Sequence, residues 1–205
     1  MYRRNEHAKK GREEDGFSLI EIMVAVAVIV IAGVLIFSNF SFNKTKGQVM
    51  YSLAGSIAGA AKRMEVDTSC YPLNTGQLFN YAKYGGNNNT CGENLSSVWN
   101  GPYSNVYSGV SGNGNIILNQ FGTGVTAAVD KGPNLIANSG EAYMIGVQFN
   151  HVPNGIASQA AIACGVAQTN GSALGGFGNN CYAGAASAQG AGVTYFTYIF
   201  AFSNT

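Results

Sequence analysis

The sequence predicts an α+β fold in which a long N-terminal α-helix packs on a C-terminal antiparallel β-sheet, a ladle-like arrangement. Three observations carry this prediction. Residues 17–37 form an apolar run with a single charge, and apolar residues then recur at helical spacing to about Glu65. From Ser104 onward the apolar period changes to two, and glycine-rich turns separate the apolar segments.

The first sixteen residues carry nine of the chain's 21 charged residues, and a charged head before an apolar run resembles a secretory signal peptide. The run from Phe17 to Phe37 is 21 residues long, however. As a helix it would measure about 31 Å, which matches a bilayer better than the 7–15-residue core of a signal peptide. No small-x-small cleavage site follows it. We therefore expect the run to remain on the chain as a membrane segment.

Glu21 is the only charged residue between Phe17 and Phe37. A glutamate at the centre of a membrane span costs about 2.5–3.5 kcal/mol on insertion scales, and less near an end. A plain membrane anchor leaves this charge unexplained. We therefore expect the Glu21 carboxylate to have a partner.

The stretch Gly16-Phe17-Ser18-Leu19-Ile20-Glu21 resembles the type III signal of type IV pilins and pseudopilins. The resemblance implies that a membrane-bound prepilin peptidase cuts between Gly16 and Phe17. The same enzyme would methylate the new amine of Phe17. Residues 1–16 would then be a leader peptide that the mature protein lacks.

The resemblance also implies a division of the mature chain. Residues 17–65 would form the long helix, of which residues 17–37 lie first in the inner membrane and later in the filament core. Residues 66–205 would form a globular head with an αβ-loop after the helix. This is the ladle fold of pilins.

In this family the carboxylate at the position of Glu21 neutralises the N-terminal amine of a neighbouring subunit. Glu21 lies four residues after Phe17, one helical turn on, and therefore on the same face. A charge pair in a low dielectric is strongly favoured once both partners are present. Pairing of Glu21 with the Phe17 amine of the same chain is the alternative.

Two features of the signal point to different subclasses. The sixteen-residue leader is long, as in type IVb pilins, whereas Phe17 as the first mature residue is typical of type IVa. The length of the mature chain favours type IVb.

The extramembrane part of the helix is predicted from apolar spacing, although its glycines weaken it. The expected apolar face comprises Val49, Leu53, Ile57, Ala60, Ala61 and Met64. A glycine- and asparagine-rich connection follows from Asp67 to Tyr107, in which Thr75 is expected to cap a short helix.

Alternation of apolar residues predicts strands in the C-terminal part. They are Asn105–Val110, Asn115–Phe121, Val125–Val129, Ala142–Phe149 and a last strand from Val193, with a turn at Val129–Asn134. A helix is expected to begin near Pro153 and to direct Cys164 at the sheet.

The four cysteines allow three pairings and contain no CxxC motif. Nearest-neighbour pairing would join Cys70 to Cys91 and Cys164 to Cys181, each closure contributing roughly 3 kcal/mol, and would indicate an oxidising compartment. Four unpaired buried thiols are the alternative. The resemblance to type IVb pilins also implies a Cys164–Cys181 bond, because a cysteine on a proline-led helix pairs there with a later cysteine.

The inventory of reactive residues argues against an enzyme. After Gly16 the chain has one histidine, His151, two aspartates and four glutamates, and no triad, phosphate loop or metal cluster can be built by spacing. No cofactor or metal is expected. The same part has six basic and six acidic residues, so a nucleic-acid partner is not expected either.

The combined features predict the structural subunit of a type IV pilus, a homo-oligomeric helical filament. The precursor would lie in the inner membrane, and the prepilin peptidase and the pilus assembly machinery would deliver it to an extracellular fimbrium. The alternatives are a minor pilin that acts as an adhesin or a DNA-binding module, and a pseudopilin of type II secretion.

Overall fold

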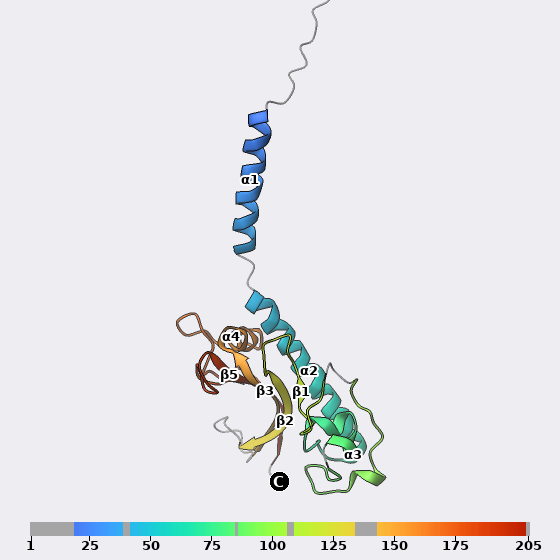
Figure 1. The fold of residues 1–205 in the computed structure, drawn as a ribbon. Helices are drawn as coiled ribbons and strands as arrows, with labels where there is room; N and C mark the ends of the chain where they lie inside the picture. The colour runs from blue at the N-terminus through green and yellow to red at the C-terminus, as the bar shows by residue number, and fades with distance from the viewer. Residues whose placement is uncertain (1–18, 39–41, 85, 106–108, 134–142, 204–205) are drawn as a thin grey trace, which may run out of the picture. The chain divides into compact units, whose positions relative to one another are not determined.

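The structure is a computed structural model that describes residues 19–38, 42–84, 86–105, 109–133 and 143–203 (Figure 1). For residues 33–38, 133 and 203 it describes the backbone alone. The chain divides into two units, Met1–Ser41 and Phe42–Thr205. The first unit contains helix α1 (Leu19–Ser38), and the second contains all the other elements.

The second unit begins with helix α2 (Phe42–Thr68). The sequence predicts one helix from Phe17 to about Glu65, and the structure has α1 and α2 along this stretch. Residues 39–41 lie outside the described residues, so the continuity of the two helices stays a prediction. The end of α2 lies slightly beyond the expected one.

Among the described residues the sheet has five strands, and every neighbouring pair is antiparallel. In the order β1-β2-β3-β5-β4 they are β1 (Ile116–Ile117), β2 (Thr126–Pro133), β3 (Tyr143–Pro153), β5 (Val193–Ser203) and β4 (Cys181–Ala183). With the helices, this sheet confirms the α+β class.

One face of the sheet forms the core with α2 and with helix α4 (Asn154–Ala163). Successive strand residues point to opposite faces, so alternate apolar residues of β2, β3 and β5 turn inward. The largest buried side chains include Phe149, Phe196, Met50, Ile57 and Met64. The sequence-based face of α2 was wrong at Val49, which is 52% exposed, because Met50 and Ala54 turn inward instead.

Several strand boundaries differ from the prediction. β2 continues through the expected turn at Val129–Asn134 to Pro133, because it pairs with β3 along its whole length. β3 continues to Pro153 through an irregularity where His151 has a φ of 56°. The short β4 was not predicted. Ala142 and residues 106–108 of the first expected strand lie outside the described residues, and Val110 forms a single bridge to Ile116.

The short helix of the αβ-loop is a 3₁₀ helix, Thr75–Leu78, capped by Asn74 rather than by Thr75. The Asn74 side chain accepts a hydrogen bond from the Gln77 backbone nitrogen at 3.2 Å. Thr75 is fully buried, and its hydroxyl accepts from the Val129 backbone nitrogen at 2.6 Å. Because β1 pairs only with Thr126 and Ala127, this hydroxyl satisfies a β2 donor beyond the end of β1.

Helix α4 begins after Pro153, as predicted, and packs closely against α2 at Gly47. A Cβ atom at Gly47 would lie 2.5 Å from the Cβ atom of Gln159 and 2.7 Å from the Ala160 backbone nitrogen. A Cβ atom at Gly55 would meet no atom within 4 Å. Of the two glycines, only Gly47 is therefore required by packing.

Gly47→Ala and Gly55→Ala are expected to change stability in opposite directions. Gly47→Ala should lower the free energy of unfolding by about 1–3 kcal/mol, because the α4 backbone must move. Gly55→Ala should raise it by about 0.5–1 kcal/mol, because alanine favours the helix. Urea unfolding followed by the fluorescence of Trp99, the only tryptophan, measures both changes. Equal effects would contradict the packing at Gly47.

Candidate functional site

Helix α1 holds the described part of the candidate site. Its sequence, LIEIMVAVAVIVIAGVLIFS, has one charged residue, Glu21, which lies in the first turn. An acidic side chain is stabilised there by the exposed N–H groups of the helix start. The Glu21 side chain is exposed. Gly16 and Phe17, the expected cleavage and methylation residues, lie outside the described residues.

The apolar surface of α1 has no packing partner among the described residues of its own unit. The large apolar side chains from Leu19 to Ile31 are each between 54% and 76% exposed. A continuous apolar surface of this kind marks an interaction surface rather than a free helix in water. Within the part of the chain that the structure describes, no helix is long and apolar enough to cross a membrane.

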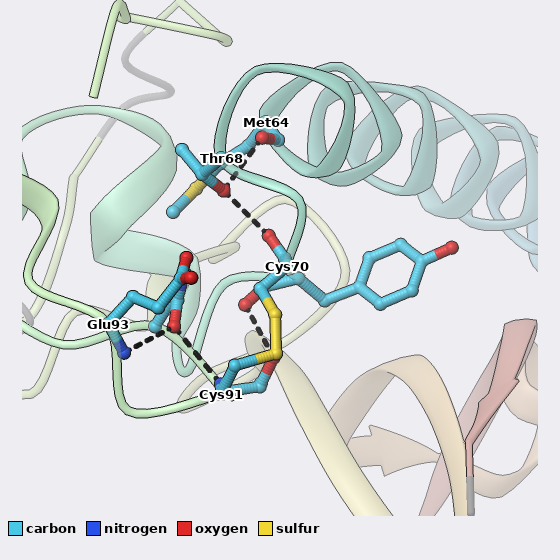
Figure 2. The surroundings of a disulfide bond; sticks show 8 residues. Met64, Thr68, Cys70, Cys91 and Glu93 are labelled. Atoms are coloured by element: carbon cyan, nitrogen blue, oxygen red, sulfur yellow. Dashed lines mark hydrogen bonds between the residues drawn. A yellow bond between two sulfur atoms is a disulfide. The ribbon is translucent and has the colours of Figure 1, made fainter. Parts of the chain in front are cut away.

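The first disulfide joins Cys70, at the start of the αβ-loop just after α2, to Cys91 further along the same loop (Figure 2). The Thr68 hydroxyl lies 2.9 Å from the carbonyl oxygens of both Met64 and Cys70, so it links the last turn of α2 to this cysteine. On the other side, the Asn89 side-chain oxygen accepts hydrogen bonds from the backbone nitrogens of Cys91 and Glu93. The bond is therefore embedded in a network of local hydrogen bonds.

The second disulfide joins Cys164, at the end of α4, to Cys181, the first residue of β4. Cys181 is fully buried and Cys164 nearly so, whereas Cys91 of the first disulfide is exposed. The two bonds are the nearest-neighbour pairs, and no described cysteine is free. The direction of Cys164 toward the sheet also agrees with the expectation from the helical pattern.

A buried glutamine organises the αβ-loop, and sequence reasoning did not find it. Gln77 is fully buried, and its side-chain oxygen accepts from the Leu73 backbone nitrogen at 2.7 Å. Its side-chain nitrogen donates to the Asn88 carbonyl at 2.7 Å, and its own carbonyl accepts from the Trp99 ring nitrogen at 2.8 Å. A polar residue between helix signals gives no sign that the later segments at Asn88 and Trp99 meet at it.

Among the described residues, three buried or half-buried tyrosines have a raised pKa, and burial is the main cause in each. Glu65 adds to the effect at Tyr71, and Asp67 adds to it at Tyr103. Burial and the hydrogen bond with Tyr182 raise the pKa of Tyr195 to about 12. The folded head therefore retains phenolic protons that the unfolded chain loses.

The stability of the head is expected to fall as the pH rises through about 10 to 12. In this window the unfolded tyrosines lose their protons first, so the native state binds more protons, and ionisation favours unfolding. Urea midpoints measured at pH values from about 8 to 11 test this. Tyr195→Phe should flatten the slope, and an unchanged midpoint in the wild-type chain would contradict the assignment.

Residues of metal-binding type do not gather in the described part of the chain, where no group of three or more His, Cys, Asp or Glu residues could hold a metal ion. His151 lies in β3 and is exposed. The geometry of the described residues thus offers an exposed apolar helix with one carboxylate and a disulfide-bonded head.

Comparison with known families adds one finding. Residues 12–37 match the model of the prokaryotic N-terminal methylation motif. This motif is the type IV prepilin signal, and the match supports a pilin-like protein. More specifically, the motif supports a type IV pilin-like or pseudopilin precursor. No curated protein and no solved structure matches the chain.

Proposed function

We propose that this chain is a structural subunit of a type IV pilus. Prepilin peptidase cuts it after Gly16 and methylates the amine of Phe17, and the mature chain polymerises through its N-terminal helix into an extracellular filament. The observation that carries the proposal is the methylation motif over residues 12–37, which coincides with an exposed apolar helix whose only charge is Glu21.

The chemistry of the helix start supports polymerisation. Cleavage after Gly16 creates a cationic amine on Phe17, one helical turn before the Glu21 carboxylate. Inside a bundle of apolar helices, either charge alone is penalised, whereas the pair is favoured. The free energy of an incoming subunit is therefore lowest at the axial position where the Phe17 amine of one subunit meets the Glu21 carboxylate of its neighbour.

The proposed route runs from the inner membrane to the cell exterior. The apolar surface of α1 is covered by lipid in the precursor and by neighbouring helices in the filament. The two disulfides of the head fit the oxidising environment outside the cytoplasm. Prepilin peptidase and the pilus assembly machinery are the partners that this route requires.

Immunogold labelling of pili sheared from the native cells tests the structural role. Antibodies against the head are expected to label filaments along their whole length. Labelling at the tips alone would contradict a structural subunit and would favour a minor pilin. Absence of the chain from the filament fraction, with retention in the membrane fraction, would favour a pseudopilin.

A further inference from the structure

The outer face of the sheet, opposite the core, contains a hollow of about 180 Å³. The alternation of strand residues places Asp130 and Gly132 of β2 on this face, since Val129 of the same strand is in the core. The register continues the same face through Gln148 of β3 and Thr197 of β5 to Tyr182 of β4. The hollow thus crosses four strands of the head.

Two glycines form the floor of the hollow, and packing explains only one of them. A Cβ atom at Gly146 would lie 2.9 Å from the Thr197 methyl carbon and 3.0 Å from the Tyr198 carbonyl oxygen. A Cβ atom at Gly132 would meet only the terminal methyl of Met144, at 4.0 Å. Glycine inside a strand weakens it and often marks a place that a ligand approaches closely. The missing side chain of Gly132 leaves the hollow open.

Aromatic rings form the wall at the β4 side. The rings of Tyr182 and Tyr195 lie 5.6 Å apart, and Phe177 packs against Tyr182 at 4.3 Å. Burial, followed by the interaction with Tyr182, raises the pKa of Tyr195, so the Tyr195 hydroxyl is neutral at neutral pH. The wall therefore presents apolar ring surface together with neutral hydroxyl groups.

Polar side chains complete the lining. Asp130 on β2 supplies a carboxylate and Gln148 on β3 supplies an amide, and the described residues give neither side chain a hydrogen-bond partner. Thr197 adds a hydroxyl. Among the described residues that line the hollow, Asp130 is the only charged one, so they would repel an anionic ligand.

We propose that this hollow binds a neutral hexose unit of a glycan. A pyranose ring offers an apolar C–H face for the aromatic wall and adjacent hydroxyl groups that donate to the Asp130 carboxylate and accept from the Gln148 amide. The volume suits a single small ring rather than a drug-sized ligand. An organic cation would pair with Asp130, but it could not accept a hydrogen bond from the Gln148 side-chain N–H groups. A sugar hydroxyl can accept this hydrogen bond.

This inference goes beyond the filament role and does not rest on it, because every lining residue belongs to the Phe42–Thr205 unit. An experiment can therefore disprove the sugar site without disproving the processing at Phe17, and the reverse. A glycan site on a filament subunit would place many copies of a weak site along one polymer, which raises the avidity for a glycan-bearing surface.

The test uses the purified full-length chain in a detergent that carries no sugar group. Methyl glycosides of glucose, galactose and N-acetylglucosamine are titrated by calorimetry and by saturation-transfer NMR. Choline and N-acetylneuraminic acid serve as cationic and anionic probes. At least one neutral glycoside is expected to bind with a Kd on the order of 1 mM, and both charged probes should bind more weakly or not at all.

Three variants locate the binding. Asp130→Asn should weaken it about tenfold, because a hydroxyl donates more strongly to a carboxylate than to an amide. Gly132→Val places a strand-compatible side chain in the hollow and should abolish binding. Thr126→Val changes the same face of the same strand outside the hollow and should leave the affinity unchanged. Urea midpoints show that each variant is folded.

Three results would overturn the proposal. Failure of every neutral glycoside to bind at roughly 50 mM, fifty times the expected Kd, would exclude the site. Choline binding that Gly132→Val removes would identify a cation site instead. Glycoside binding that persists in both Asp130→Asn and Gly132→Val would place the sugar elsewhere on the head.

Discussion

Glu21→Ala is expected to abolish filament assembly while the precursor is still cleaved after Gly16. The cleaved chain would bring its Phe17 ammonium into the apolar filament core without a carboxylate to meet it. Breaking a buried charge pair by removing one partner costs about 3–5 kcal/mol. This loss recurs at every subunit contact and corresponds to at least a hundredfold weaker addition of each subunit. The yield of sheared filaments, compared with the amount of cleaved chain in the membrane, measures it.

Two further substitutions at Glu21 separate charge from shape. Glu21→Gln preserves the size of the side chain and should fail like alanine, whereas Glu21→Asp preserves the charge and should restore part of the assembly. Met23→Leu changes a neighbouring position of α1 without touching the charge, and should assemble normally. Normal filament yield from Glu21→Gln would contradict the proposed pairing of the carboxylate with the amine.

Removal of the Cys164–Cys181 bond is expected to have the largest effect on the stability of the head. The bond closes a loop with a sequence separation of 17 and joins the end of α4 to β4. Cys164→Ala with Cys181→Ala should lower the free energy of unfolding by about 3 kcal/mol for loop closure, and further for the cavity left at two buried sulfurs. Urea unfolding followed by circular dichroism gives the value.

The Cys70–Cys91 bond provides the matched control. Its sequence separation of 21 gives nearly the same loop term, but Cys91 is exposed, so less packing is lost. Cys70→Ala with Cys91→Ala should therefore destabilise the head less than the Cys164 and Cys181 pair. The reverse order of the two variants would contradict the role given to packing around Cys181.

Local patterns predicted the parts of the fold that depend on local physics. The alternating segment from Val193 became β5, and the proline before α4 marked the helix start. The end of β3 was missed because its last residues pair with β5 beyond an irregularity, which depends on a distant strand. β4 is only three residues long, and it is held by β5 and by the bond from Cys181 rather than by its own pattern.

The two candidate sites differ in the same way. The processing signal is one continuous stretch, Gly16 to Glu21, so the order of residues along the chain is enough to identify it. The hollow is assembled from Asp130, Gln148 and Tyr182, which the strand order β2-β3-β5-β4 brings to one face. Gly132 of the hollow lies in the stretch Val129–Asn134, which the sequence predicted to be a turn. Gly132 could be placed on the outer face of the sheet only because β2 continues to Pro133 in the structure.

The N-terminal peptide of the chain in sheared filaments shows whether the precursor is cut between Gly16 and Phe17. Mass spectrometry of a digest of this fraction identifies the first residue and any modification of its amine. We expect a peptide that begins at Phe17 and carries one methyl group on its amine. A peptide that begins at Met1 would contradict both cleavage after Gly16 and the role of Glu21, because an uncleaved chain has no amine at Phe17 for Glu21 to neutralise.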